Sequence, residues 1–70
     1  MKMTAVKSSN IENIGYDAHS QMLHVQFKGG STYAYEYVTQ AEHEALMGAQ
    51  SLGTHLHAHI KSKLKGIVKP

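Results

Sequence analysis

The chain has 70 residues, of which 41% are hydrophobic, and its formal net charge is +2 with all six histidines neutral. This length predicts one domain over residues 1–70, with a core at about 4–64, and leaves too little buried surface for a deep substrate cleft. The sequence contains no cysteine, which excludes a disulfide framework and a thiolate zinc site. No stretch approaches the roughly 18 apolar residues of a membrane span. We therefore expect a cytoplasmic protein that makes no contact with a membrane.

The first half of the chain has the alternating pattern of β-strands. Leu23, Val25 and Phe27 alternate with polar residues, which places all three on one face of a strand. Residues 4–9 are either an edge strand or an extended lead-in. Ile11 is out of phase with Ile14 in the alternation of side chains along a strand, which indicates a bulge near residues 10–13. The expected main strands are residues 10–16, 22–27 and 33–38. Three consecutive strands joined by short turns predict an antiparallel meander.

The hydrophobic period becomes helical after the third predicted strand. Thr39 and Glu42 have the spacing of a capping box, which predicts the start of a helix. Thr54 is the expected cap of a second helix, whose apolar stripe is Leu56, Ile60, Leu64 and Ile67. The predicted fold is α+β: a three-stranded antiparallel meander followed by two C-terminal helices packed on one face. The expected core cluster is Leu23, Val25, Phe27, Leu46, Leu56 and Ile60.

The register of the central hairpin decides which way the tyrosines of the third strand point. A two-residue turn at 29–30 pairs Gln26 with Tyr33 and exposes the tyrosines as a platform for stacking. A three-residue loop at 29–31 shifts the pairing by one residue and turns the tyrosines toward the core. It pairs Phe27 with Tyr33, Val25 with Tyr35, and Leu23 with Tyr37. We favour this second register because it gathers the strong apolar and aromatic residues on one face.

Residues 4–64 contain a set of residues whose order along the chain is recognisable. It comprises Val6, Ser8, Ser9, Ile11, Ile14, Gly15, Tyr16, Asp17, Leu23, Val25, Phe27, Gly30, Tyr33, Tyr35, Val38, Ser51, Gly53, Ile60 and Lys61. Together these residues resemble the KTSC domain. That small family is named after the C-terminal region of certain lysine-tRNA synthetases, and it also occurs as stand-alone bacterial proteins. The resemblance implies RNA binding, by association with the synthetase, and it supplies no catalytic residues.

The sequence departs from this family at two places. Thr39 stands where the family usually has proline, and a capping threonine preserves the helix start there. His55, Leu56 and His57 stand where the family tends to have Tyr-Phe-Asn. If that aromatic pair contributes to binding in the family, its loss weakens or changes the function of this chain.

The histidines raise the question of a metal site. His55 and His59 are four residues apart, which is a zinc-like spacing on a helix, but a stable site needs a third or fourth ligand. His43, Glu42 or Glu44 would supply it only with a favourable crossing of the two helices. We therefore expect no metal, no other cofactor, and histidines that face solvent. The sequence also lacks a nucleophile motif, a phosphate-binding glycine loop and paired catalytic acids, so we expect no enzyme and no small-molecule substrate.

Nucleic-acid binding is the function that we favour. Single strands are held by aromatic faces that stack on bases and by cations that contact phosphates. The candidate binding residues are Lys28, Tyr33, Tyr35, His57, Lys61, Lys63 and Lys65. The alternative is a protein-interaction module, or self-association, through a sheet edge or an exposed tyrosine patch. Salt distinguishes the two, because nucleic-acid affinity falls steeply as salt rises.

Overall fold

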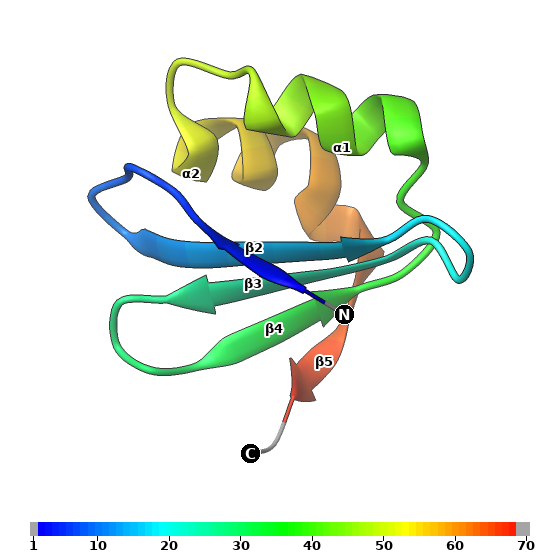
Figure 1. Ribbon diagram of the computed structural model, residues 1–70, viewed down its shortest axis with the longest axis horizontal. Helices are drawn as coiled ribbons and strands as arrows, with labels where there is room; N and C mark the ends of the chain where they lie inside the picture. The colour runs from blue at the N-terminus through cyan, green and yellow to red at the C-terminus, as the bar shows by residue number, and fades with distance from the viewer. Residues whose placement is uncertain (1, 69–70) are drawn as a thin grey trace.

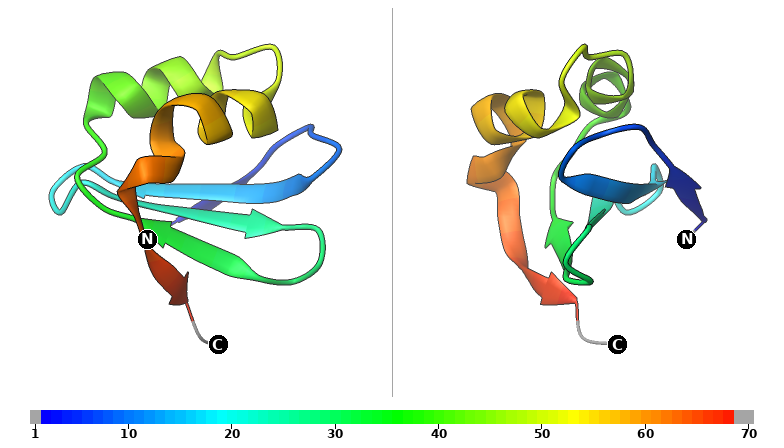
Figure 2. Two further views of the ribbon diagram at one scale, coloured as in Figure 1. Left: turned by 180° about the vertical axis from the view of Figure 1, so that it is seen from behind. Right: turned by 90° about the vertical axis from the view of Figure 1, so that its left-hand side faces the viewer.

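Residues 2–68 fold into a five-stranded antiparallel sheet whose strands lie side by side in sequence order (Figure 1). The computed structural model describes residues 2–68. The strands are β1 (Met3–Ala5), β2 (Ile11–Asp17), β3 (Met22–Phe27), β4 (Thr32–Tyr35) and β5 (Leu64–Val68). Between β4 and β5 the chain forms α1 (Gln40–Met47), α2 (Leu52–His55), a π-helical turn η1 (Leu56–Ile60) and a 3₁₀ turn η2 (Lys61–Lys63). The helical segments cover one face of the sheet (Figure 2).

The α+β class is therefore correct, but the predicted three-stranded meander followed by helices is wrong. The meander of β2, β3 and β4 is present, and β1 adds to one edge while β5 adds to the other. The misassignment of β5 has a clear cause, since Leu56, Ile60, Leu64 and Ile67 have helical spacing in the sequence. The helical segment instead ends at η2, and Leu64 begins a strand.

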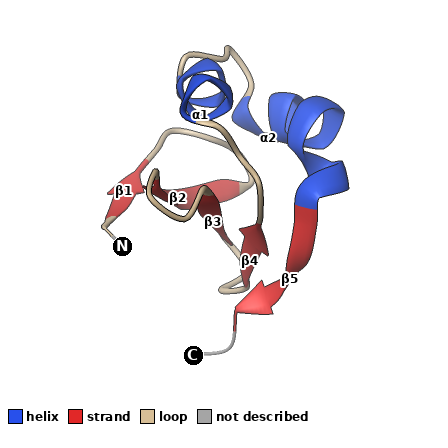
Figure 3. Ribbon diagram, turned by 90° about the vertical axis from the view of Figure 1, so that its right-hand side faces the viewer, coloured by secondary structure: helices blue, strands red, loops and turns tan. Residues whose placement is uncertain are grey.

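Local sequence and pairing both favour a strand at β5. Ile67 and Val68 are β-branched residues, and glycine at position 66 destabilises a helix. The strand satisfies its backbone groups by pairing with β4, where Ile67 lies opposite Tyr33 and Leu64 lies opposite Tyr35. In Figure 3, β5 continues directly from the helical segment and runs down beside β4.

The helix starts are set by side-chain caps. The capping box at Thr39 is confirmed, because the Thr39 hydroxyl accepts from the Glu42 N–H and the Glu42 carboxylate accepts from the Thr39 N–H. The second helix begins earlier than predicted. Ser51, and not Thr54, is its N-cap, and its hydroxyl accepts from the Thr54 N–H at 3.4 Å. This earlier start makes Leu52 a helical residue and buries it.

The core lies between the sheet and the helical layer. It contains five of the six residues predicted for it, while Phe27 is half-buried and packs against the cluster from its edge. The full cluster is Ile11, Ile14, Leu23, Val25, Tyr35, Val38, Leu46, Leu52, Leu56 and Ile60. Ile11 joins it because the pairing of β2 with β3 shifts between Ile11 and Asn13. This irregularity is the bulge that the phase of Ile11 predicts.

In the central hairpin, Tyr33 and Tyr35 lie on the predicted face of the sheet, but they pair with other residues of β3 than predicted. Val25 lies opposite Tyr33 and Leu23 lies opposite Tyr35, which is two residues away from the favoured register. The loop is Lys28 to Gly30, closed by the Phe27 N–H donating to the Ser31 carbonyl at 2.8 Å, and Gly30 adopts a positive φ of 97°. A two-residue slip keeps each side chain on the same face, so Tyr33 and Tyr35 still point toward the helical layer.

Tyr37 does not continue the strand as predicted. β4 ends at Tyr35, and Tyr37 has a positive φ of 60° and is 71% exposed. Its backbone turns the chain out of the sheet toward α1.

Leu46 offers a test of this core. Leu46 belongs to α1, and its side chain is fully buried. Leu46→Ala should therefore lower the free energy of unfolding by about 2–5 kcal/mol. Met47 is the next residue and is exposed, so Met47→Ala should change stability by about 0.5 kcal/mol or less. Urea unfolding followed by circular dichroism measures both. Equal losses in the two variants would contradict the assignment of Leu46 to the core.

Candidate nucleic-acid interface

A pocket of about 300 Å³ lies between the β4–β5 side of the sheet and the α2–η1 segment. We call it the tyrosine pocket. It is lined by Asn10, Phe27, Tyr33, Tyr35, Gly53, Leu56, His57, Lys61 and Leu64. Four of the seven residues predicted to bind nucleic acid, Tyr33, Tyr35, His57 and Lys61, are thus brought together around one cavity.

The pocket exists because burial decreases across the sheet toward β5. Val25, Tyr33 and Ile67 form one row of paired residues across β3, β4 and β5, and paired residues project to the same side of a sheet. Val25 is fully buried, Tyr33 is half-buried and Ile67 is 61% exposed. The helical layer therefore covers the start of the row and leaves its end open.

The two tyrosines of the pocket have different environments. Tyr35 is 4% exposed and belongs to the core, and burial raises the pKa of its phenol. Tyr33 is half-buried and packs edge-to-face against Phe27, with ring centroids 5.2 Å apart. Tyr33 is the more open of the two and can offer part of its ring to a ligand, whereas Tyr35 is buried.

One cation lines the tyrosine pocket, and two more lysines are next to lining residues in the sequence. Lys61 lines it and is exposed. Lys28 and Lys65 are exposed and directly follow the lining residues Phe27 and Leu64. No aspartate or glutamate is among the lining residues. The pocket thus combines an apolar, aromatic wall with a positive charge at its rim, that of Lys61.

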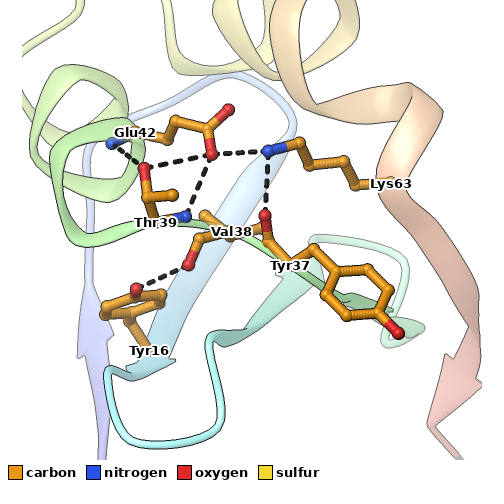
Figure 4. A network of polar contacts seen from close by, with 6 residues as sticks. All are labelled: Tyr16, Tyr37, Val38, Thr39, Glu42 and Lys63. Atoms are coloured by element: carbon orange, nitrogen blue, oxygen red, sulfur yellow. Dashed lines mark hydrogen bonds and ion pairs between the residues drawn. The ribbon is translucent and has the colours of Figure 1, made fainter.

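Lys63 is engaged elsewhere (Figure 4). Its ammonium donates to the Glu42 carboxylate at 2.5 Å and to the Tyr37 carbonyl at 2.9 Å. Of the predicted nucleic-acid ligands, Lys63 is therefore the one held in an intramolecular ion pair. The partner carboxylate lies 21 positions away in the sequence, so no local pattern marks it.

The ion pair and the capping box share one carboxylate. The Lys63 ammonium, together with the Thr39 N–H, holds the pKa of Glu42 at about 2, against an ordinary value of 4.5. Next to it, the Tyr16 hydroxyl donates to the Val38 carbonyl at 2.6 Å. This network joins β2, the turn after β4, α1 and η2.

The prediction that the histidines face solvent is wrong for His43. The half-buried His43 ring stacks on Tyr16 with centroids 4.4 Å apart, and burial lowers the pKa of its imidazole. His55 and His59 do share a face, with ring centroids 4.6 Å apart. Within residues 2–68, no group of three histidine, cysteine, aspartate or glutamate side chains is arranged to hold a metal ion.

Five of the nine residues that line the pocket were not among the predicted binding residues. Phe27, Leu56 and Leu64 were assigned to the core or to the apolar stripe of the second helix, and the other two are Asn10 and Gly53. Asn10 reaches the pocket from the β1–β2 connection, and Gly53 lies in the first turn of α2. Gly53 belongs to the set of residues that resembles the KTSC domain, so this resemblance could have marked Gly53 as a candidate site residue. Asn10 had no such signal, because its position depends on the fold of the connection.

Comparisons with known proteins agree with this architecture. A model of the KTSC domain matches residues 7–63. An uncharacterized protein of Stutzerimonas stutzeri is 41% identical over 61 residues, covering 87% of this chain and 86% of that protein. A protein of Tsukamurella paurometabola is 35% identical over 65 residues, covering 93% and 97% of the two chains. The crystal structure of a KTSC domain protein from Yersinia pestis superposes with a TM-score of 0.85 at 37% identity, covering 99% of this chain and 96% of that one.

Membrane insertion by a helix is not indicated by the structure. Within residues 2–68, no helix is both long enough and apolar enough to cross a bilayer.

The Glu42 carboxylate gives the fold a testable pH dependence. Its pKa is lowered in the folded state, so the ion pair stabilises the protein above about pH 4.5, and this stabilisation is lost as the pH falls toward 2. Glu42→Gln keeps an acceptor for the capping box but removes the charge. We expect it to cost about 1 kcal/mol at pH 7, since the pair is partly exposed, and almost nothing at pH 2.

Urea unfolding at several pH values measures this difference. Glu44→Gln, on the exposed side of the same helix, is the control and should show no comparable trend. A difference between wild type and Glu42→Gln that stays constant from pH 7 to pH 2 would contradict the assignment.

Proposed function

The chain belongs to the KTSC domain family, and we propose that it binds single-stranded RNA at the tyrosine pocket without catalysing a reaction. The observation that carries this proposal is the grouping of Tyr33, His57 and Lys61 around one small apolar cavity. The cavity volume is at the lower end of the ~300–1,000 Å³ typical of ligand sites. We expect a cavity of this size to hold one base. A base that enters would contact the Tyr33 ring, and its flanking phosphates would lie near the cationic rim.

The arrangement of charge supports an anionic ligand. Lys28, Lys61 and Lys65 come from three different elements, the β3–β4 loop, η2 and β5. All three are exposed, so their ammonium groups reach a polyanion at little desolvation cost. Contacts of this kind supply most of the affinity of non-specific nucleic-acid binding.

A protein-interaction module is the second candidate, and one observation favours it. β5 is an edge strand, and two of its apolar residues are exposed, Leu64 at 44% and Ile67 at 61%. An extended peptide adds to such an edge through main-chain hydrogen bonds and side-chain contacts. The positive charge around the pocket is not needed for that mode, which is why we place RNA binding first.

Titration of a fluorescent oligouridylate of about eight nucleotides tests the proposal by fluorescence anisotropy. Tyr33→Ala should weaken binding about 5- to 150-fold, because stacking on one aromatic ring contributes about 1–3 kcal/mol. Lys61→Ala should weaken binding at low salt and lower the slope of log K against log salt by about 0.7, the value for one phosphate contact on a single strand.

Lys2→Ala is the matched control for Lys61→Ala, because Lys2 is exposed and lies before β1 at the opposite edge of the sheet. Circular dichroism establishes that each variant is folded; Lys61→Ala alters only an exposed side chain. Absence of binding by the wild type at low salt, or equal effects of Lys61→Ala and Lys2→Ala, would refute the proposed site. Binding of a peptide that is insensitive to salt would favour the second candidate.

A further inference from the structure

A second cavity adjoins the tyrosine pocket. Its volume is about 480 Å³, and Asn10, Gly53 and His57 line both cavities. Four hydroxyl side chains also line the second cavity, Ser8, Ser9, Ser51 and Thr54. We call it the hydroxyl cavity. The two cavities are neighbours, one with a mainly apolar lining and one rich in hydrogen-bonding groups, and we refer to them together as the cleft.

We propose that the hydroxyl cavity holds the ribose of the nucleotide whose base occupies the tyrosine pocket, and that contact with its 2′-hydroxyl makes the protein prefer RNA to DNA. The inference rests on the proposed function and adds the class of sugar to it. The 2′-hydroxyl is the group by which a protein distinguishes the two nucleic acids at a given site.

Gly53 lies where the linings of the two cavities meet, and it has no side chain that could project between them. A Cβ atom built there would lie 3.7 Å from the Asn10 side-chain nitrogen. The Asn10 amide therefore lies beside Gly53, where the two linings meet. A base and its sugar are joined by a single bond, so a nucleotide that fills both cavities would cross from one to the other here.

The hydroxyl groups retain hydrogen-bonding capacity for a ligand. The Ser8 oxygen accepts from the N–H groups of Asn10 and Ile11 at 3.2 and 3.3 Å, and its own hydrogen stays available to donate. The Thr54 oxygen accepts from the Ser51 hydroxyl at 3.0 Å, so the Thr54 hydrogen is likewise available. A ribose hydroxyl both donates and accepts, and it matches such groups.

The charges around the cleft fit a backbone that continues on both sides of the bound nucleotide. Neither cavity has an acidic residue in its lining. Lys61 is exposed at the tyrosine pocket, and the exposed Lys7 precedes Ser8 at the hydroxyl cavity. Each cavity is therefore lined by a segment that carries an exposed lysine, to which a flanking phosphate of the bound nucleotide could bind.

The test compares oligouridylate with oligodeoxyuridylate of the same length, about eight nucleotides, since these probes differ only in the 2′-hydroxyl. We expect the wild type to bind the RNA about three- to tenfold more tightly in fluorescence anisotropy, the effect of one hydrogen bond. Thr54→Val and Ser9→Ala, at two exposed residues that line the hydroxyl cavity but not the tyrosine pocket, should each reduce this ratio while changing affinity for the DNA by no more than about twofold. Thr4→Val replaces an exposed threonine of β1 and is the matched control that should keep the wild-type ratio.

The outcomes separate this inference from the proposed function. Equal affinity of the wild type for the two probes overturns the sugar preference and leaves RNA binding at the tyrosine pocket intact. A preference that survives unchanged in both Thr54→Val and Ser9→Ala overturns the placement of the ribose in the hydroxyl cavity. Binding of neither probe overturns both proposals. Circular dichroism confirms folding of each variant before its ratio is interpreted.

Discussion

The sheet of this protein is wider than the helical layer that covers it, and the candidate site follows from that mismatch. The helical segment packs over the central strands, where Val25 and Leu23 are fully buried. β5 extends the same face beyond the cover, so Leu64 and Ile67 stay exposed although they pair with Tyr35 and Tyr33. A pocket forms where the cover ends, because there the sheet still presents apolar side chains without a helix to fill the space above them.

The polar network around Lys63 is located where the chain must return from the helices to the sheet. The Glu36 N–H donates to the Lys63 carbonyl at 2.9 Å, and the Lys63 ammonium reaches Glu42 and the Tyr37 carbonyl. These bonds connect the end of β4, the first turn of α1 and the start of β5. Lys63 thus helps to fix where β5 begins, and so where the open side of the sheet lies. Its charge acts within the fold, whereas the charge of Lys61 faces solvent.

Sequence reasoning succeeded where a structural feature depends on neighbouring residues. Alternation identified β2, β3 and β4, the phase of Ile11 identified the bulge, and Thr39 and Glu42 identified the start of α1. It failed for β5 because the helical spacing of Leu64 and Ile67 is compatible with two structures, and the choice depends on pairing with β4. It also failed for Lys63, whose partners come from distant positions. The composition of the site was partly predictable, since Tyr33, His57 and Lys61 were candidates from the start, but their meeting in one pocket required the fold.

The departure of this chain from its family at residues 55–57 also becomes interpretable. His55 does not line the tyrosine pocket and instead lines a separate cavity with Glu42 and His59. Leu56 lines the tyrosine pocket and is 4% exposed, so leucine at this position keeps an apolar wall and occupies less space than the phenylalanine typical of the family. His57 then adds an aromatic ring to the same pocket. Residues 55–57 of this chain therefore give the pocket a buried apolar wall at Leu56 and an exposed aromatic ring at His57, which lines the same cavity as Lys61.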